Sequence, residues 1–89
     1  MKEYTLDGVW DDADGLEVTY VGVDLSEEMI NRVVAGNSDD NAFTDTVEAE
    51  SVAEAFQALA ESLDAYSVWD CRGAKARRVY TQPEDGDDA

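Results

Sequence analysis

The chain lacks the residues on which most enzyme active sites depend. It has no histidine, one cysteine (Cys71) and one proline (Pro83). Histidine is the side chain that most often acts as a base near neutral pH, and a thiol nucleophile such as Cys71 usually needs one beside it. One cysteine forms no internal disulfide, which is typical of a reducing compartment. We therefore expect a non-enzymatic cytoplasmic protein that needs no cofactor, with Cys71 as a small core residue.

Long apolar stretches are also missing. The N-terminal residues carry no apolar run, and no stretch approaches the ~18 apolar residues that a membrane-spanning helix requires. We expect neither a signal peptide nor a membrane span, and no membrane as a partner.

Basic residues are scarce. The 89 residues include six Lys and Arg against 22 Asp and Glu, and the formal net charge is −16. A small soluble domain is well served by a net charge of about 2–8 in magnitude, and self-repulsion beyond that destabilises a compact state in dilute salt. At about 1 M salt the Debye length falls to about 3 Å, which removes most of the repulsion. We interpret the chain as a halophilic protein whose acidic residues form a salt-adapted surface; mimicry of a nucleic acid is the competing interpretation.

The length and the hydrophobic pattern indicate a single domain over residues 1–82, followed by an acidic tail over 83–89 that we expect to be disordered. Apolar and polar residues alternate over 2–10 and over 16–25, which is typical of half-buried strands, and the turn between them suits a hairpin. In the second of these strands the apolar parity changes, which indicates either a bulge at Gly22 or burial on both faces. Further strands are expected over 43–47, 66–71 and 76–82.

Two helices are indicated by their caps and their apolar spacing. Ser26 is a suitable N-cap for a helix over about 27–35, and Ser51 and Glu54 have the spacing of a capping box for a helix over 52–63. The second helix has apolar residues on one face at Val52, Phe56, Leu59 and Leu63. The order ββ-α-(β)-α-ββ predicts an α+β fold of two layers, an antiparallel sheet of four or five strands with both helices on one face.

The few basic residues are concentrated in one place. Positions 72–78 hold four of the six and no acidic residue, giving +4, whereas the rest of the chain has two basic against 22 acidic residues, a net of −20. Aromatic residues lie on either side of this window, and Tyr, Trp and Arg are enriched at protein interfaces. The predicted contact residues are Trp69, Arg72, Lys75, Arg77, Arg78 and Tyr80.

Three interpretations of this basic hairpin remain open. It could balance charge within the fold. It could bind a protein partner, or a second copy in a homodimer, together with the sheet face that the helices leave open. It could also bind single-stranded nucleic acid, because cations neutralise phosphates and aromatic rings stack on bases. Our functional hypothesis is a protein–protein interaction module, and nucleic-acid binding is the alternative.

One acidic segment has the oxygen-ligand spacing of a twelve-residue calcium loop and resembles an EF-hand loop. Its candidate ligands are Asn37, Asp39, Asn41, Asp45 and Glu48. The segment has Asn37 where the loop normally begins with Asp, and Ala42 where it needs Gly. We therefore expect a polar loop and no bound metal.

Overall fold

The computed structural model describes residues 1–11 and 15–83, so the tip of the first hairpin and positions 84–89 of the predicted tail lie outside the described residues. The elements follow the predicted order closely. They are β1 (Lys2–Trp10), β2 (Gly15–Val23), α1 (Glu27–Gly36), β3 (Ala42–Ala49), α2 (Val52–Leu63), β4 (Ser67–Asp70) and β5 (Arg77–Thr81).

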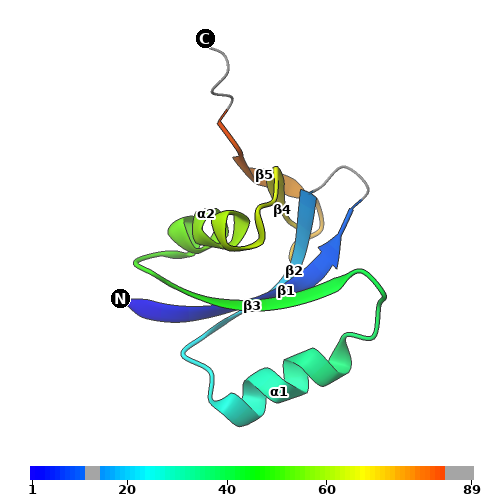
Figure 1. Cartoon of the computed structure of the whole chain (residues 1–89), viewed down its shortest axis with the longest axis vertical. Helices are drawn as coiled ribbons and strands as arrows, with labels where there is room; N and C mark the ends of the chain where they lie inside the picture. Colours follow the sequence, from blue (N-terminus) through cyan, green and yellow to red (C-terminus); the bar gives the residue numbers. More distant parts are fainter. Residues whose placement is uncertain (12–14, 84–89) are drawn as a thin grey trace.

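The five strands form one sheet in the order β3-β1-β2-β4-β5 (Figure 1). Both predicted hairpins are present, because β1 pairs antiparallel with β2 and β4 pairs antiparallel with β5. The two hairpins meet through β2 and β4, which run parallel. The α+β class is confirmed, but the prediction of an antiparallel sheet is wrong, since the long connection through α1, β3 and α2 returns the chain beside β2 in the same direction.

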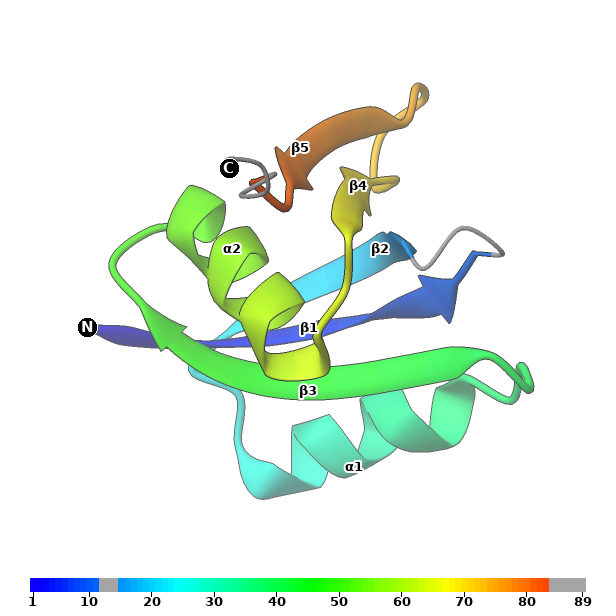
Figure 2. The same cartoon turned by 45° about the horizontal axis from the view of Figure 1, so that its top comes forward.

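The helices lie on opposite faces of the sheet, α2 above it and α1 below it (Figures 1 and 2). The prediction that both helices share one face is therefore wrong. The reason is visible in β1, where Tyr4 and Leu6 are buried on the α2 side while Thr5 and Asp7 are buried on the α1 side. A strand buried on both faces needs a cover on each.

The apolar core fills the space between the sheet and α2. Ser51 caps α2 by accepting a hydrogen bond from the Glu54 amide, as predicted, and the helix buries Phe56 and Leu59 against the sheet. The sheet contributes Leu6, Leu16, Val18 and Val68, all fully buried. This layer accounts for most of the apolar burial, and it fixes the position of β4 and β5 beneath the helix.

The layer between the sheet and α1 is polar by comparison. The Asp7 carboxylate is buried and accepts hydrogen bonds from the hydroxyl of Thr44 and from Nδ2 of Asn37, the latter at 3.0 Å. The hydroxyls of Thr5 and Thr46 lie 3.1 Å apart. Helix α1 itself contains no buried residue. It therefore covers a hydrogen-bonded layer of strand side chains and adds little to the apolar core.

A β-bulge at Thr19 explains the change of apolar parity in β2. The register skips this residue, since Asp7 is opposite Tyr20 whereas Gly8 is opposite Val18. Because of this extra residue, the alternating apolar side chains before and after the bulge point to the same, α2 side of the sheet. The predicted bulge at Gly22 is therefore wrong. Only glycine fits at position 8, because a Cβ there would collide with the carbonyl oxygen of Glu17.

Candidate functional site

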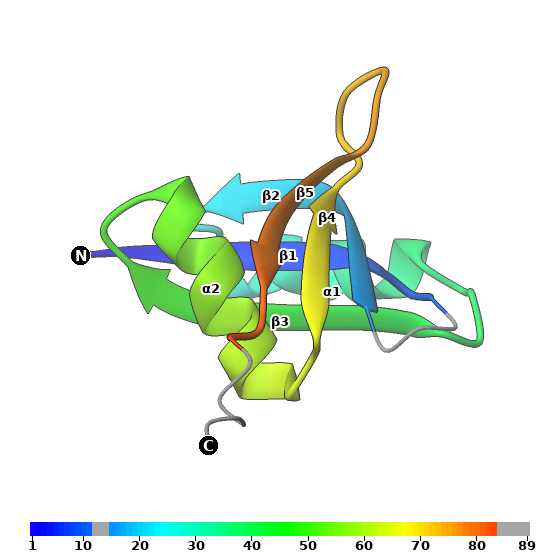
Figure 3. The same ribbon diagram turned by 90° about the horizontal axis from the view of Figure 1, so that it is seen from above.

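The β4–β5 hairpin carries all six predicted contact residues, and its turn extends beyond the sheet (Figure 3). The hairpin register divides them between the two faces. Trp69 is opposite Arg78, whereas Val68, which belongs to the core, is opposite Tyr80. Tyr80 therefore packs against the core on the α2 side, and Trp69 with Arg78 lies on the other face. Lys75 is exposed in the turn. The six residues do not form one continuous patch.

Arg72 is held within the fold by Asp70. Its Nε donates to Oδ1 and its terminal nitrogen to Oδ2 of that carboxylate, both at 2.9 Å, and its guanidinium lies 5.7 Å from the centre of the Phe56 ring. The hydrogen bonds from Arg72 lower the pKa of Asp70 to about 2, against the opposing effect of burial. A bidentate pair of this kind orients the arginine firmly. Arg72 thus anchors the hairpin to α2 and is poorly placed to bind a partner.

Arg77 is close to the same carboxylate but far more accessible. Its terminal nitrogen lies 3.6 Å from Oδ2 of Asp70, and its side chain is 73% exposed. An ion pair this exposed contributes little to stability. The Arg77 guanidinium is therefore available to another molecule at small cost to the fold.

The open face of the sheet presents a row of side chains that crosses four strands. Successive register pairs join Val9 to Glu17, Glu17 to Trp69, and Trp69 to Arg78. The Arg78 guanidinium lies 5.6 Å from the centre of the Trp69 ring, a cation–π contact. This part of the sheet extends past α1, which lies across the β1 and β3 side (Figure 2). We call Val9, Glu17, Trp69 and Arg78 the open-face row.

Cys71 continues β4 beside the open-face row. Its amide donates to the carbonyl oxygen of Val18 at 2.8 Å, and its side chain is half-buried. Burial raises the pKa of the thiol, and the carboxylates of Glu17 and Asp70 raise it further. A thiol with a raised pKa is a weak nucleophile at neutral pH. Cys71 is thus half-buried beside the open-face row and does not belong to the apolar core where it was expected.

The segment that resembles a calcium loop is a loop only in its first half, because β3 begins at Ala42. Asp45 and Glu48 lie within β3, and Asp45 accepts a hydrogen bond from the Ser62 hydroxyl of α2 at 2.7 Å. Asn37 points to Asp7 instead, and Asp39 caps its own turn by accepting from the Asn41 amide. Within residues 1–11 and 15–83, no group of three or more acidic or cysteine side chains could hold a metal ion. The candidate ligands are therefore separated by the strand.

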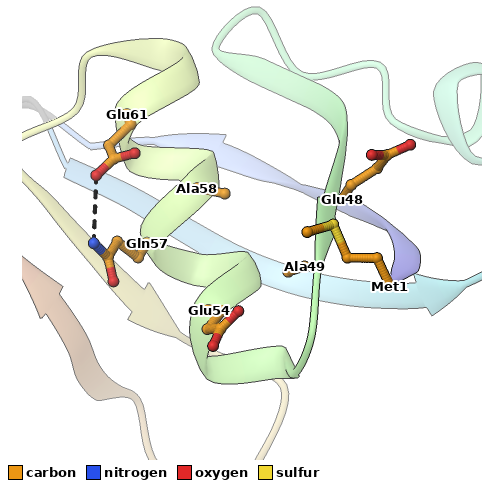
Figure 4. A pocket seen from close by; sticks show the side chains of 7 residues that line it. All are labelled: Met1, Glu48, Ala49, Glu54, Gln57, Ala58 and Glu61. Atoms are coloured by element: carbon orange, nitrogen blue, oxygen red, sulfur yellow. Dashed lines mark hydrogen bonds between the residues drawn. The ribbon is translucent and has the colours of Figure 1, made fainter.

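A shallow depression of about 300 Å³ lies between α2 and the end of β3 (Figure 4). Its lining residues are Met1, Glu48, Ala49, Glu54, Gln57, Ala58 and Glu61. None of the lining side chains is basic, and the one hydrogen bond drawn runs along α2 from Gln57 to Glu61 at 3.4 Å. Glu54 and Glu61 accept hydrogen bonds from the Glu50 amide and the Gln57 side chain, so local structure accounts for these carboxylates.

Sequence reasoning missed Glu17 and Asp70. Glu17 alternates with Leu16 and Val18, which indicates that it lies on the polar face of its strand. Nothing in this alternation shows that β4 lies beside β2, so the neighbour of Glu17 could not be predicted. Asp70 was two residues from Arg72, and this spacing across the start of a turn was a usable signal for an internal ion pair.

Comparison with protein-family models, with curated proteins and with solved structures gives no match. No helix in the described part of the chain is long and apolar enough to cross a membrane.

Proposed function

We propose that this protein is a small, non-enzymatic interaction module that binds a protein partner through the open-face row and the outer side of the β4–β5 hairpin. The observation that supports it is the row itself, an indole with a guanidinium over it and a carboxylate beside it, on a sheet face that α1 leaves uncovered. Trp and Arg are the residue types most enriched at interface hot spots. Lys75 adds accessible positive charge at the turn, and Arg77 adds it on the α2 face of the hairpin, opposite Asp70.

The same geometry favours a protein over a single-stranded nucleic acid. Stacking with a base needs a free aromatic face, and one face of Trp69 is already occupied by Arg78. Glu17 lies beside the ring and repels phosphate, and Arg72 is committed to Asp70. These contacts make nucleic-acid binding the less favoured alternative, and the experiments below include a test for it.

We further propose that the protein works in the cytoplasm of a high-salt cell. The net charge of −16 supports this proposal, since molar salt screens the repulsion between its carboxylates. Apolar and cation–π contacts lose less strength in salt than phosphate contacts do, and high salt suppresses the counterion release on which nucleic-acid affinity depends.

The proposal is tested by affinity capture from a high-salt lysate, comparing the wild type with the double variant Arg77→Ala/Arg78→Ala. We expect the variant to lose the captured partner while its unfolding midpoint in denaturant stays close to that of the wild type. The matched control is Lys2→Ala/Arg32→Ala, which removes the same charge from the two basic residues that lie outside positions 72–78. Equal capture by both double variants would contradict the proposal, as would unfolding of the Arg77/Arg78 variant.

A further inference from the structure

Strand β3 ends the sheet on the side opposite the hairpin, and backbone groups on its outer side have no partner among residues 1–11 and 15–83. The Trp10 amide donates to Asn41 on the β3 side, whereas the Glu3 carbonyl accepts from Asp24 on the β2 side. The backbone N–H and C=O groups of even-numbered residues in β1 therefore form their hydrogen bonds with β3. Their partners are the odd-numbered residues of β3. Because strand residues alternate, the backbone groups of Thr44, Thr46 and Glu48 point away from the sheet.

The two edges of the sheet differ in how they are protected from pairing. Strand β5 has five residues, begins with two arginines, skips Val79 in its register and is soon followed by Pro83. Charge, a bulge and a nearby proline are the usual means of blocking an edge. Strand β3 has eight residues in unbroken register with β1, and contains neither proline nor glycine nor a basic residue. Only this edge is long and regular enough to accept another strand.

We propose that the outer edge of β3 pairs antiparallel with the β3 edge of a second copy, giving a dimer with one continuous sheet. With the two-fold axis at Thr46, the outward residues meet in hydrogen-bonded pairs: Thr46 with Thr46, and Thr44 with Glu48. Asp45 then lies opposite Val47 of the second copy. No two carboxylates are directly opposite in this register, whereas a two-fold axis at Asp45 would place Asp45 against itself.

Self-complementarity selects a second copy over an unrelated strand. The edge pairs with itself without opposing like charges, and the resulting isologous contact closes after two subunits. The open-face row is left free at each end of the sheet, so the dimer would present two copies of it. Each subunit carries −16, so repulsion opposes the dimer in dilute salt and is screened at molar salt.

The test compares Glu48→Pro with Glu48→Ala by sedimentation equilibrium in 2 M and 0.2 M KCl. Both variants remove the same exposed carboxylate, but only proline removes the outward N–H, and proline is tolerated on an edge whose N–H faces solvent. We expect a wild-type dimer that weakens in 0.2 M KCl. Glu48→Ala should dimerise at least as tightly, and Glu48→Pro should raise the dissociation constant by about tenfold or more, since two symmetric hydrogen bonds are lost.

Amide hydrogen exchange supplies an independent readout on the wild type. The amides of Thr44, Thr46 and Glu48 should become protected as the concentration rises through the dimer range, while amides of the β5 edge should not. A protein that stays monomeric at millimolar concentration in 2 M KCl would overturn the proposal. So would a dimer that resists Glu48→Pro but is lost in Arg77→Ala/Arg78→Ala; that result would place self-association on the open face and leave the proposed function standing.

Discussion

Replacement of Asp70 by asparagine should cost stability in a way that depends on pH. The carboxyl has a pKa of about 2 in the fold, against 3.8 in its ordinary state. Each pKa unit corresponds to about 1.4 kcal/mol, so ionised Asp70 stabilises the fold by about 2 kcal/mol well above pH 4. Because the folded pKa is lowered, this contribution is lost as the pH falls toward 2, and less than half of it remains at pH 2.5.

The assay is urea unfolding of the wild type and Asp70→Asn at fixed KCl between pH 6 and pH 2.5. The difference in unfolding free energy should shrink by about 1–2 kcal/mol over that range, whatever constant offset the asparagine introduces. Other carboxyl groups titrate in both proteins and cancel in the difference. Glu61→Gln, which removes one exposed carboxylate without touching the Asp70–Arg72 pair, serves as the control for the loss of charge. A flat difference for Asp70→Asn would contradict the lowered pKa, because Asp70 would then have an ordinary pKa.

Three further predictions concern the rest of the fold. Gly8→Ala should destabilise by about 3 kcal/mol or more in denaturant unfolding, because its Cβ meets the Glu17 carbonyl, whereas exposed Gly36→Ala should be neutral or stabilising. Ser51→Ala should cost about 1 kcal/mol through loss of the α2 cap, and Ser51→Asp should restore it; a neutral alanine variant would mean that the cap is dispensable. The unfolding midpoint should fall as KCl is lowered from molar to millimolar, and a salt-independent midpoint would contradict the halophilic interpretation.

The elements with strong local signals could be predicted from the sequence. Helix α2 occupies the predicted residues 52–63, because its cap and its apolar spacing are both local features. The neighbour relations could not be predicted in the same way. Periodicity shows which side chains share a face, but the parallel pairing of β2 with β4 depends on how a connection of some forty residues returns to the sheet.

The position of α1 was mistaken for a related reason. Met29, Ile30, Val33 and Val34 form an apolar stripe on this helix, a pattern that favours a place against the core, yet no residue of the helix is buried. The helix covers polar side chains of β1 and β3, and this polar layer is formed by residues that alternation alone assigned to a solvent-facing side.

The candidate site was predicted in composition but not in geometry. The hairpin and its residues were found, whereas the face on which each arginine lies depends on the skipped Val79. This bulge places Arg78 opposite Trp69 and Arg77 opposite Asp70. Turn length and bulge position are set by tertiary packing, so the sequence could not separate the anchoring arginine from the accessible ones.

The most direct test of the proposed interface is an amide and indole NMR titration of the labelled protein in high salt. It uses unlabelled lysate of a high-salt cell in one series and a mixed-sequence single-stranded oligonucleotide in the other. We predict that the lysate broadens resonances of Glu17, Trp69, Cys71 and Arg78, and that the oligonucleotide leaves them unchanged. Saturable shifts along the hairpin with the oligonucleotide alone would contradict the account and identify a nucleic-acid-binding module instead.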